Sequence, residues 1–319
     1  MVTIDLITGF LGSGKTTFLK KYAEYFMDQG MHIGILENDF GAINVDMLML
    51  HELRGDQCEL EMIAGGCDAE SHRRRYRTKL ISMRMCGYDR VLVEPSGIYD
   101  VDEFFDVLRE EPLDQWYEIG NVITILDARL EDNLSEQADY LLASEAANAG
   151  KVILSHADAA TRKQCEDTVA HLNRALEEIR CDRRIDSEKD ILQTDLTDLT
   201  KEALEEVSKC GYRLESYRKM DLENGQSFDS LFFMEEKITS EALERAVPRL
   251  FADKSCGEVF RIKGFVKNGA GQWMELNATP DSHTMQSVTA GQEVLIVIGE
   301  HLQEDKIREI LKEEETCQS

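Results

Sequence analysis

The chain has 319 residues, of which 42% are hydrophobic, enough to build a sizeable core in two domains. Its 62 acidic and 36 basic residues give a net charge of -26, which repels nucleic acid and anionic membranes and excludes both as general partners. No apolar run approaches the roughly 20 residues that span a bilayer, and no basic leader precedes the first apolar run, so we expect a soluble, cytoplasmic protein.

The first half of the sequence alternates apolar runs with charged stretches of helical periodicity. Such alternation is typical of a doubly wound α/β domain with a mostly parallel sheet, in which ligands bind at the carboxyl ends of the strands. An apolar segment at 191–192 and an amphipathic stretch at 201–207 close this domain, to which we assign residues 1–211. The runs predicted as parallel strands are residues 2–7, 32–36, 90–94, 121–126 and 151–155.

The composition turns polar and loses its periodicity over residues 212–226, which indicates a linker. The pattern after the linker predicts a smaller α+β domain over residues 227–319, in the order β-α-β-β-β-α with a mostly antiparallel sheet. Its predicted strands are residues 231–233, 259–266, 273–276 and 294–298. A helix at 240–250 follows the first strand, and a terminal helix follows the last.

The segment from Gly9 to Thr16 reads G-F-L-G-S-G-K-T and directly follows the first predicted strand. It is a complete G-x-x-x-x-G-K-[ST] phosphate-binding loop. The glycines let successive backbone N–H groups face one point, the following helix adds its positive end, and Lys15 reaches the β- and γ-phosphates. Thr16 is then placed to ligate Mg²⁺. The predicted nucleotide contacts are Gly9, Gly12, Ser13, Gly14, Lys15 and Thr16.

Two further strand ends carry carboxylates. Residues 90–94 end in Glu94, which can hold Mg²⁺ directly or through water, and the N–H of Gly97 can sense a γ-phosphate. Glu37 and Asp39 follow the strand at 32–36, and they can complete the Mg²⁺ shell or orient an attacking water. A simple turn after a strand also favours Asn, Asp and Gly, so this segment by itself leaves both interpretations open.

The run 151–155 is followed by a segment that suits recognition of a purine base. It reads Ser155-His156-Ala157-Asp158, at the place where an N-K-x-D guanine-recognition motif stands in GTPases. Asp158 can accept hydrogen bonds from both guanine N1–H and N2–H₂, a pair of donors that adenine does not have. The sequence therefore favours GTP over ATP.

Taken together, these motifs resemble the CobW-like family of P-loop GTPases, relatives of the urease and hydrogenase nickel-insertion GTPases. The matching segments cover nearly the whole chain. In the first domain they are G-F-L-G-S-G-K-T-T at 9–17, E-N-D-F-G at 37–41, E-x-x-G at 94–97 and Asp158, and in the second domain F-R-I-K-G-F-V at 260–266 and V-I-G at 297–299. The first of these motifs adds Thr17 to the predicted nucleotide contacts. Members deliver zinc, cobalt or nickel to client proteins or cofactor pathways. The resemblance implies a GTP-gated metallochaperone whose cofactors are GTP and Mg²⁺.

The sequence departs from this family in two motifs. The family's metal signature G-C-x-C-C is here Gly66-Cys67-Asp68-Ala69-Glu70, so two of three thiolates are replaced, which lowers the affinity for zinc and other soft ions. Cys67, Asp68, Glu70 and His72 can form a mixed site, with help from Glu37, or the loop is simply solvated. In the base motif, Ser155 replaces Asn and His156 replaces Lys, whose packing an imidazole can take over by stacking.

We therefore predict slow GTP hydrolysis that switches the segments 37–41 and 94–97 between ordered and relaxed states. Lys15 neutralises developing charge, Thr16 and Glu94 hold Mg²⁺, and Asp39 or Glu37 places the water. The expected partner is a client metalloprotein or cofactor-pathway protein, and a homodimer is a further option; Zn²⁺, Co²⁺ and Ni²⁺ are the cargo metals considered. The alternatives are a GTP-dependent adaptor without metal and a small-molecule kinase that uses the basic patch 73–79 as a lid.

Overall fold

A computed structural model of the chain divides into two compact units, Met1–Met220 and Asp221–Ser319. It describes residues 1–10, 12–39, 50–64, 69–95, 101–130, 134–218, 229–234, 238–280, 282–288, 291 and 293–316. Within these residues no helix is both long and apolar enough to cross a membrane.

The first unit is built on a seven-stranded sheet with helices on both faces. Its strands are β1 (Val2–Gly9), β2 (Ile33–Asp39), β3 (Cys58–Ala64), β4 (Arg90–Pro95), β5 (Tyr117–Asp127), β6 (Lys151–Ser155) and β7 (Ile191–Gln193). Its α-helices are α1 (Lys15–Met27), α3 (Ala69–Arg84), α4 (Val101–Leu108), α5 (Leu113–Trp116), α6 (Glu136–Ala147), α7 (Arg162–Glu178) and α8 (Lys201–Val207). Two short 3₁₀ helices, η1 (His51–Leu53) and η2 (Leu196–Asp198), complete it.

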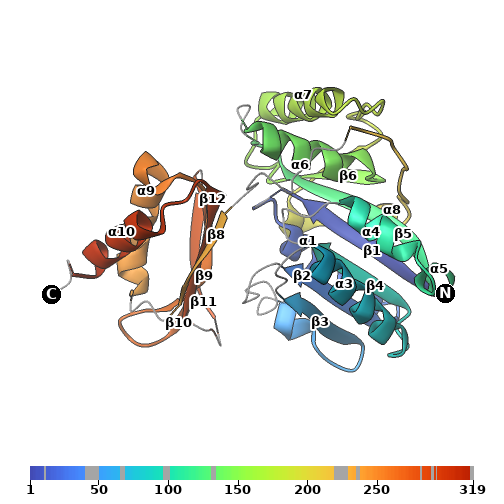
Figure 1. The fold of residues 1–319 in the computed structure, drawn as a ribbon, viewed down its shortest axis with the longest axis horizontal. Helices are drawn as coiled ribbons and strands as arrows, with labels where there is room; N and C mark the ends of the chain where they lie inside the picture. The colour runs from blue at the N-terminus through green and yellow to red at the C-terminus, as the bar shows by residue number, and fades with distance from the viewer. Residues whose placement is uncertain are drawn as a thin grey trace. The chain divides into compact units, whose positions relative to one another are not determined.

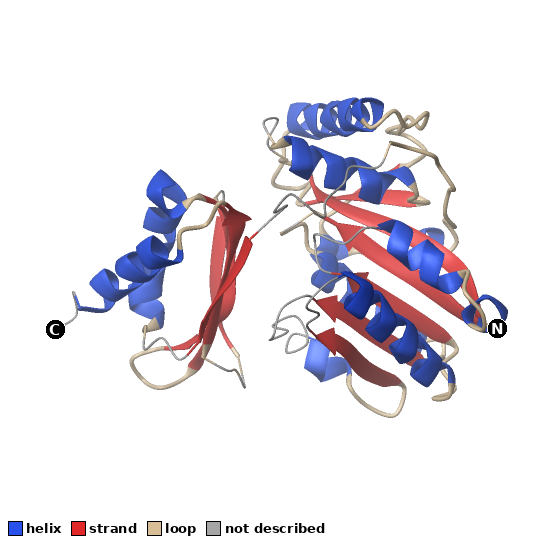
Figure 2. Ribbon diagram, viewed as in Figure 1, coloured by secondary structure: helices blue, strands red, loops and turns tan. Residues whose placement is uncertain are grey.

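The strand order of this sheet is β3-β2-β4-β1-β5-β6-β7, and its neighbouring strands are parallel. Helices α3, α4 and α6 cover the face toward the viewer in Figures 1 and 2, while α1 and α8 cover the other face. This arrangement confirms the predicted doubly wound α/β fold and all five predicted parallel strands. The order reverses direction at β1, so the crevice where such folds bind ligands opens at the carboxyl end of β1.

Helix α1 follows β1 directly and packs against the sheet through an apolar stripe. Phe18, Leu19, Tyr22 and Phe26 recur at helical spacing, and all four are buried. They join a core that includes Ile7 of β1 and other apolar side chains of the sheet. The turn between β1 and α1 is therefore held from both sides by packed elements.

The sequence analysis missed two strands, β3 and β11 (Ser282–Ser287), and both lie at the edge of a sheet. Strand β3 carries two acidic residues, Glu59 and Glu61, which accept hydrogen bonds from Tyr88 at 2.7 Å and from Lys79 at 2.8 Å. An edge strand needs only one partner and is often polar or charged. Neither segment therefore carries the apolar run on which the prediction relied.

The segment 212–218 joins the first unit, although the sequence placed the linker from residue 212 onward. Arg213 N–H donates to Asn148 O at 2.9 Å, and Arg218 N–H donates to Ile179 O at 2.7 Å. The first unit therefore extends past the predicted limit, and the linker residues 219–226 lie outside the described residues.

The second unit is an α+β fold on a five-stranded antiparallel sheet in the order β11-β10-β9-β12-β8. Its helices α9 and α10 lie on the same face of the sheet (Figure 1), and Arg249 of α9 bridges to Glu314 of α10 at 2.6 Å. Between α9 and α10 the chain forms four strands, β9 to β12, where the sequence predicted three; the additional strand is β11, which corrects the predicted order β-α-β-β-β-α. The elements not yet given are β8 (Asp229–Met234), α9 (Ser240–Ala252), η4 (Lys254–Cys256), β9 (Glu258–Lys267), β10 (Trp273–Thr279), β12 (Val294–Glu300) and α10 (Glu304–Thr316).

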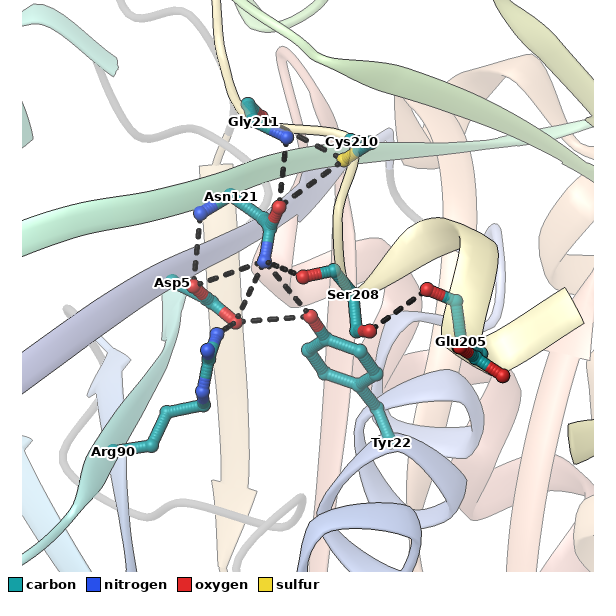
Figure 3. A network of polar contacts seen from close by, with 8 residues as sticks. All are labelled: Asp5, Tyr22, Arg90, Asn121, Glu205, Ser208, Cys210 and Gly211. Carbon is teal, nitrogen blue, oxygen red and sulfur yellow. Dashed lines mark hydrogen bonds and ion pairs between the residues drawn. The ribbon is translucent and has the colours of Figure 1, made fainter. Parts of the chain in front are cut away.

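A buried polar network crosses the first unit at the middle of β1 (Figure 3). Asp5 accepts hydrogen bonds from Arg90 Nη1 at 2.5 Å, from Tyr22 Oη at 2.9 Å and from the backbone N–H of Asn121 at 2.8 Å. The Asn121 amide continues the network to the residues after α8, because it donates to Ser208 O and accepts from the N–H of Gly211. The network thereby ties β1, α1, β4, β5 and the end of α8 together.

Candidate functional site

The turn after β1 has a backbone form that requires glycine. Gly9 has φ 144°, and a Cβ at this position would lie 2.1 Å from the carbonyl oxygen of Ile125 in β5. Gly14 has φ 93°, and its Cβ would lie 2.6 Å from Cδ1 of Leu196 in η2. Both conformations are in the left-handed region or beyond it, where side chains other than hydrogen are strained. Two glycines of the sequence motif are thus explained by close packing on β5 and on the loop after β7.

Lys15 is buried at the start of α1 and points back to this turn. Its Nζ donates to the carbonyl oxygens of Gly9 at 2.8 Å and Phe10 at 3.4 Å. Ser13 is buried beside it, and its Oγ has no hydrogen-bond partner within the described part of the chain. A buried cation, a buried hydroxyl and the backbone N–H groups at the start of a helix converge here, which is the chemistry of an anion site.

Thr16 connects the first turn of α1 to the carboxyl end of β4. Its Oγ1 donates to Oε1 of Glu94 at 3.0 Å, and Glu94 is buried. The hydroxyl and carboxylate that the sequence assigned to Mg²⁺ are therefore adjacent in space, although 78 residues separate them.

Glu37 stands next to Glu94 on the same face of the sheet. The two residues are register partners in the parallel pair β2–β4, and both are buried. Neighbouring strands lie about 4.8 Å apart, so two buried carboxylates at this spacing repel each other unless a cation or a proton compensates them. Together with Thr16 they form a set of hard oxygen donors of the kind that Mg²⁺ prefers. The residues present thus fit the predicted metal.

A second polar group lies at the carboxyl ends of β5 and β6. Asp127 accepts hydrogen bonds from Nε and Nη2 of Arg129 at 3.1 Å and 3.0 Å, and its Oδ2 lies 2.9 Å from Nδ1 of His156. Burial acts to raise the pKa of Asp127, but these hydrogen bonds outweigh it and hold the pKa well below its ordinary value. The same contact raises the pKa of His156 and favours the imidazolium.

The predicted base-recognition residues differ in their exposure. Ser155 is buried at the end of β6, where its Oγ donates to Leu126 O at 3.1 Å. Asp158 is exposed in the turn that follows. The sequence analysis missed Asp127 as the partner of His156. Its position at the end of the apolar run 121–126 was the available signal, because polar side chains at the ends of parallel strands gather at one edge of the sheet.

Several predicted residues are not placed in the site. Gly97 and Cys67 lie outside the described residues, and so do the side chains of Asp39 and Glu70. Thr17 is exposed at the start of α1. His72, a candidate metal ligand, is buried on α3 with its Nδ1 3.3 Å from Oε1 of Glu103. In the described part of the chain, no three Cys, His, Asp or Glu side chains gather into a metal-binding group.

Comparison with known proteins gives one family match. The model of the nucleotide-binding domain described as CobW/HypB/UreG matches residues 3–185. That range contains the phosphate loop, both carboxylates of the metal donor set and the group around Asp127. More than half of the chain is therefore covered.

Three curated proteins have similar sequences. Zinc chaperone YjiA of Escherichia coli K12 is 27% identical over 184 residues, 54% of this chain and 55% of YjiA. Zinc chaperone YeiR of the same organism is 31% identical over 131 residues, 41% of this chain and 39% of YeiR. Zinc-regulated GTPase metalloprotein activator 1 of Schizosaccharomyces pombe is 24% identical over 166 residues, 49% of this chain and 37% of that protein. The chain thus spans about half or less of the length of the curated relatives it matches.

Proposed function

This chain belongs to the CobW/HypB/UreG nucleotide-binding family, and we propose on that premise that it is a Mg²⁺-dependent GTPase that acts as a GTP-gated metallochaperone or insertion protein. The observation that carries the proposal is the hydrogen bond of 3.0 Å between Thr16 and Glu94 beside the buried Lys15. This contact supports the proposal because it places the hydroxyl and carboxylate proposed to hold Mg²⁺ next to the lysine proposed to bind phosphate, at the end of β1.

We assign each described residue of the site a separate role in binding and hydrolysis. Lys15 exchanges the carbonyl oxygens of Gly9 and Phe10 for phosphate oxygens and neutralises the charge that develops during hydrolysis. Thr16 and Glu94 would hold Mg²⁺, which when bound supplies positive charge at the phosphates. Glu37, or Asp39 two residues later, orients the attacking water. No arginine finger or catalytic glutamine is assigned, so we expect slow turnover until a partner binds.

Guanine specificity rests on the group that follows β5 and β6. Asp158 is exposed in the turn and is assigned to the N1–H and N2–H₂ donors of the base. Asp127 fixes the imidazole of His156, which takes the place of the family's lysine beside the base. An imidazole held by Asp127 can stack on a purine, and its fixed orientation lowers the entropic cost of doing so.

The cargo is a divalent transition metal passed to a client protein in the cytoplasm. Two of the curated relatives are named zinc chaperones, which makes Zn²⁺ the first metal to test before Co²⁺ and Ni²⁺. Cys67, Glu70 and Glu37 are its proposed ligands. The alternative, a GTP-dependent adaptor without cargo, is favoured by Ala69 and Glu70, which stand where the family has cysteines.

The nucleotide proposal is tested by calorimetric titration with Mg²⁺-GTP and Mg²⁺-ATP. We expect tighter binding of GTP, and Lys15→Ala should weaken that binding by at least about 100-fold, because a buried phosphate charge loses its cation. Lys20→Ala is the matched control: Lys20 lies on the same helix and pairs with the exposed Glu52 at 2.6 Å. Unchanged affinity in the Lys15 variant would remove the phosphate-loop assignment.

The metal proposal is tested by repeating the titration after loading with Zn²⁺. Stoichiometric Zn²⁺ that changes GTP affinity or turnover, and that Cys67→Ala removes, supports a metallochaperone. GTP binding that is indifferent to Zn²⁺, Co²⁺ and Ni²⁺ contradicts metal delivery and leaves the adaptor.

A further inference from the structure

A buried carboxyl group lies beneath the phosphate loop and belongs to none of the sequence motifs of the nucleotide site. Glu145 of α6 has no solvent exposure. The ammonium group of Lys15 acts on it, and the hydroxyl of Thr8 and the backbone N–H of Gly9 face it. Within the described part of the chain, neither carboxyl oxygen has a well-formed hydrogen bond, and the same holds for Thr8 Oγ1.

The position of this carboxyl group is fixed by the fold. The carbonyl oxygen of Glu145 accepts a hydrogen bond of 2.8 Å from Thr124 Oγ1, which pins α6 to β5. Ser135 caps the start of the same helix by accepting from the N–H of Ala138 at 3.2 Å. The side chain is therefore delivered to the base of the loop by an anchored helix.

Such a group is costly unless something compensates it. Burial in a low-dielectric interior disfavours the charged form of a carboxylate, and the group responds by binding a proton. Burial raises the pKa of Glu145 to about 7, although Lys15, Thr8 and Gly9 each act to lower it. The group thus changes charge within the physiological range of pH. The lack of well-formed hydrogen bonds to these buried oxygens also points to a role other than stability.

We propose that Glu145 is a positioning residue of the nucleotide site, which holds the ammonium of Lys15 inward when deprotonated and releases it to the nucleotide phosphates when protonated. This inference rests on the proposed function. Within the described ranges, the groups that act on Glu145 are Lys15 from α1, Thr8 and Gly9 from β1, and Thr124 from β5 at its backbone; of these, Lys15 is ionisable.

The coupling between proton and nucleotide is reciprocal. Phosphates that enter the loop add negative charge near Glu145 and share its counter-ion, so binding of the nucleotide must favour the protonated carboxyl group. One proton is taken up from solvent onto a carboxyl oxygen, and no other bond changes. By linkage, nucleotide affinity then rises as the pH falls through the titration of Glu145.

The test measures Mg²⁺-GDP affinity by calorimetry between pH 6 and pH 8.5, in buffers with different ionisation enthalpies. We expect wild-type affinity to fall by up to about tenfold over this range, since one pK unit of coupling corresponds to a tenfold change in affinity, and we expect uptake of a proton on binding. Glu145→Gln keeps the shape and removes the charge. It should give a flat profile, no linked proton, and binding at pH 8 at least as tight as wild type.

The matched control is Ser144→Ala, which alters the neighbouring buried residue whose hydroxyl donates to Leu141 O at 2.9 Å within α6. It should keep the wild-type pH profile. If Glu145→Gln instead keeps the wild-type slope and proton uptake, the inference is overturned while nucleotide binding stands.

A second measurement uses neither a nucleotide nor the Glu145→Gln variant. The side-chain carboxyl signal of Glu145, followed by ¹³C NMR in the nucleotide-free protein, should titrate near neutral pH, and Lys15→Ala should move that titration to higher pH because the compensating cation is lost. A titration that Lys15→Ala leaves in place would refute the coupling. Absence of Mg²⁺-GDP binding by the wild type, with the NMR shift present, would instead count against the proposed function alone.

Discussion

Strand β1 carries two buried polar regions, and they differ in how well their groups are satisfied. At its middle, Asp5 accepts hydrogen bonds from Arg90, Tyr22 and Asn121 (Figure 3). At its carboxyl end, Thr8 and the nearby Glu145 and Ser13 are equally buried, yet their side-chain oxygens have no well-formed hydrogen bond within the described part of the chain.

The contrast separates groups that hold the fold from groups that await a ligand. A fully connected polar network inside a protein rigidifies the core, because each member compensates the desolvation of the others. A buried group without partners costs stability and persists where it has another use. The Asp5 network is therefore the structural base of the first unit. We call the carboxyl edge of its sheet, where β1, β5 and β6 end, the working edge.

The largest expected effect lies in the satisfied region. Asp5→Asn keeps the shape but removes the charge that pairs with Arg90, whose side chain is mostly buried. Leaving one member of a buried pair uncompensated costs about 3–5 kcal/mol of unfolding free energy. Urea denaturation followed by circular dichroism measures this loss. Asp56→Asn, at an exposed turn residue, is the control and should change stability by less than about 0.5 kcal/mol. A loss below about 1 kcal/mol for Asp5→Asn would show that the network is not the base of the fold.

The same chemical change at Glu145 should act in the opposite direction. Its pKa of about 7 in the folded state lies above the ordinary value of 4.5, so the folded protein binds this proton more tightly than the unfolded chain does. The stabilisation is complete below about pH 4.5 and is lost as the pH rises through about 7, by about 3 kcal/mol in total. Glu145→Gln should lack this decline and be at least as stable as wild type at pH 8. Urea denaturation at pH 5 and pH 8 compares the two, and a Gln variant that is less stable at pH 8 would mean that the carboxyl group has partners after all.

Local patterns in the sequence were enough to predict the central strands and the phosphate loop. The run 2–7 and the glycines at 9 and 14 carry their own structural reasons, as the close approaches to Ile125 and Leu196 show. Edge strands such as β3 were missed because a strand with a single neighbour is less enclosed by the protein and does not need an unbroken apolar run.

Residues that act through distant partners could not be read from spacing. Asp127 meets His156 across 29 positions, and Lys15 acts on Glu145 across 130 positions of the sequence (145 − 15). Each is an acidic residue in a chain with 62 of them, so composition gives no reason to select it. Only the parallel packing of β1, β5 and β6 brings these carboxyl groups to the working edge.

The pair of Asp127 and His156 lies between the two extremes, because it is satisfied but stands at the working edge, and the His156 side chain is 44% exposed. The hydrogen bond between them raises the pKa of His156 and lowers the pKa of Asp127. The pair therefore stabilises the fold most between about pH 4 and 6.5, where the carboxylate and the imidazolium coexist. This contribution is lost as the pH rises through the folded pKa of His156. Asp127→Asn should cost about 1 kcal/mol at pH 6, a value kept small by solvent screening, and less at pH 8. It should also move the NMR titration of the His156 ring to lower pH, with His283 of the second unit as internal reference. If the cost is instead the same at both pH values while the His156 titration stays in place, Asp127 acts through Arg129 alone, and the working edge carries no charge on His156 to offer a nucleotide.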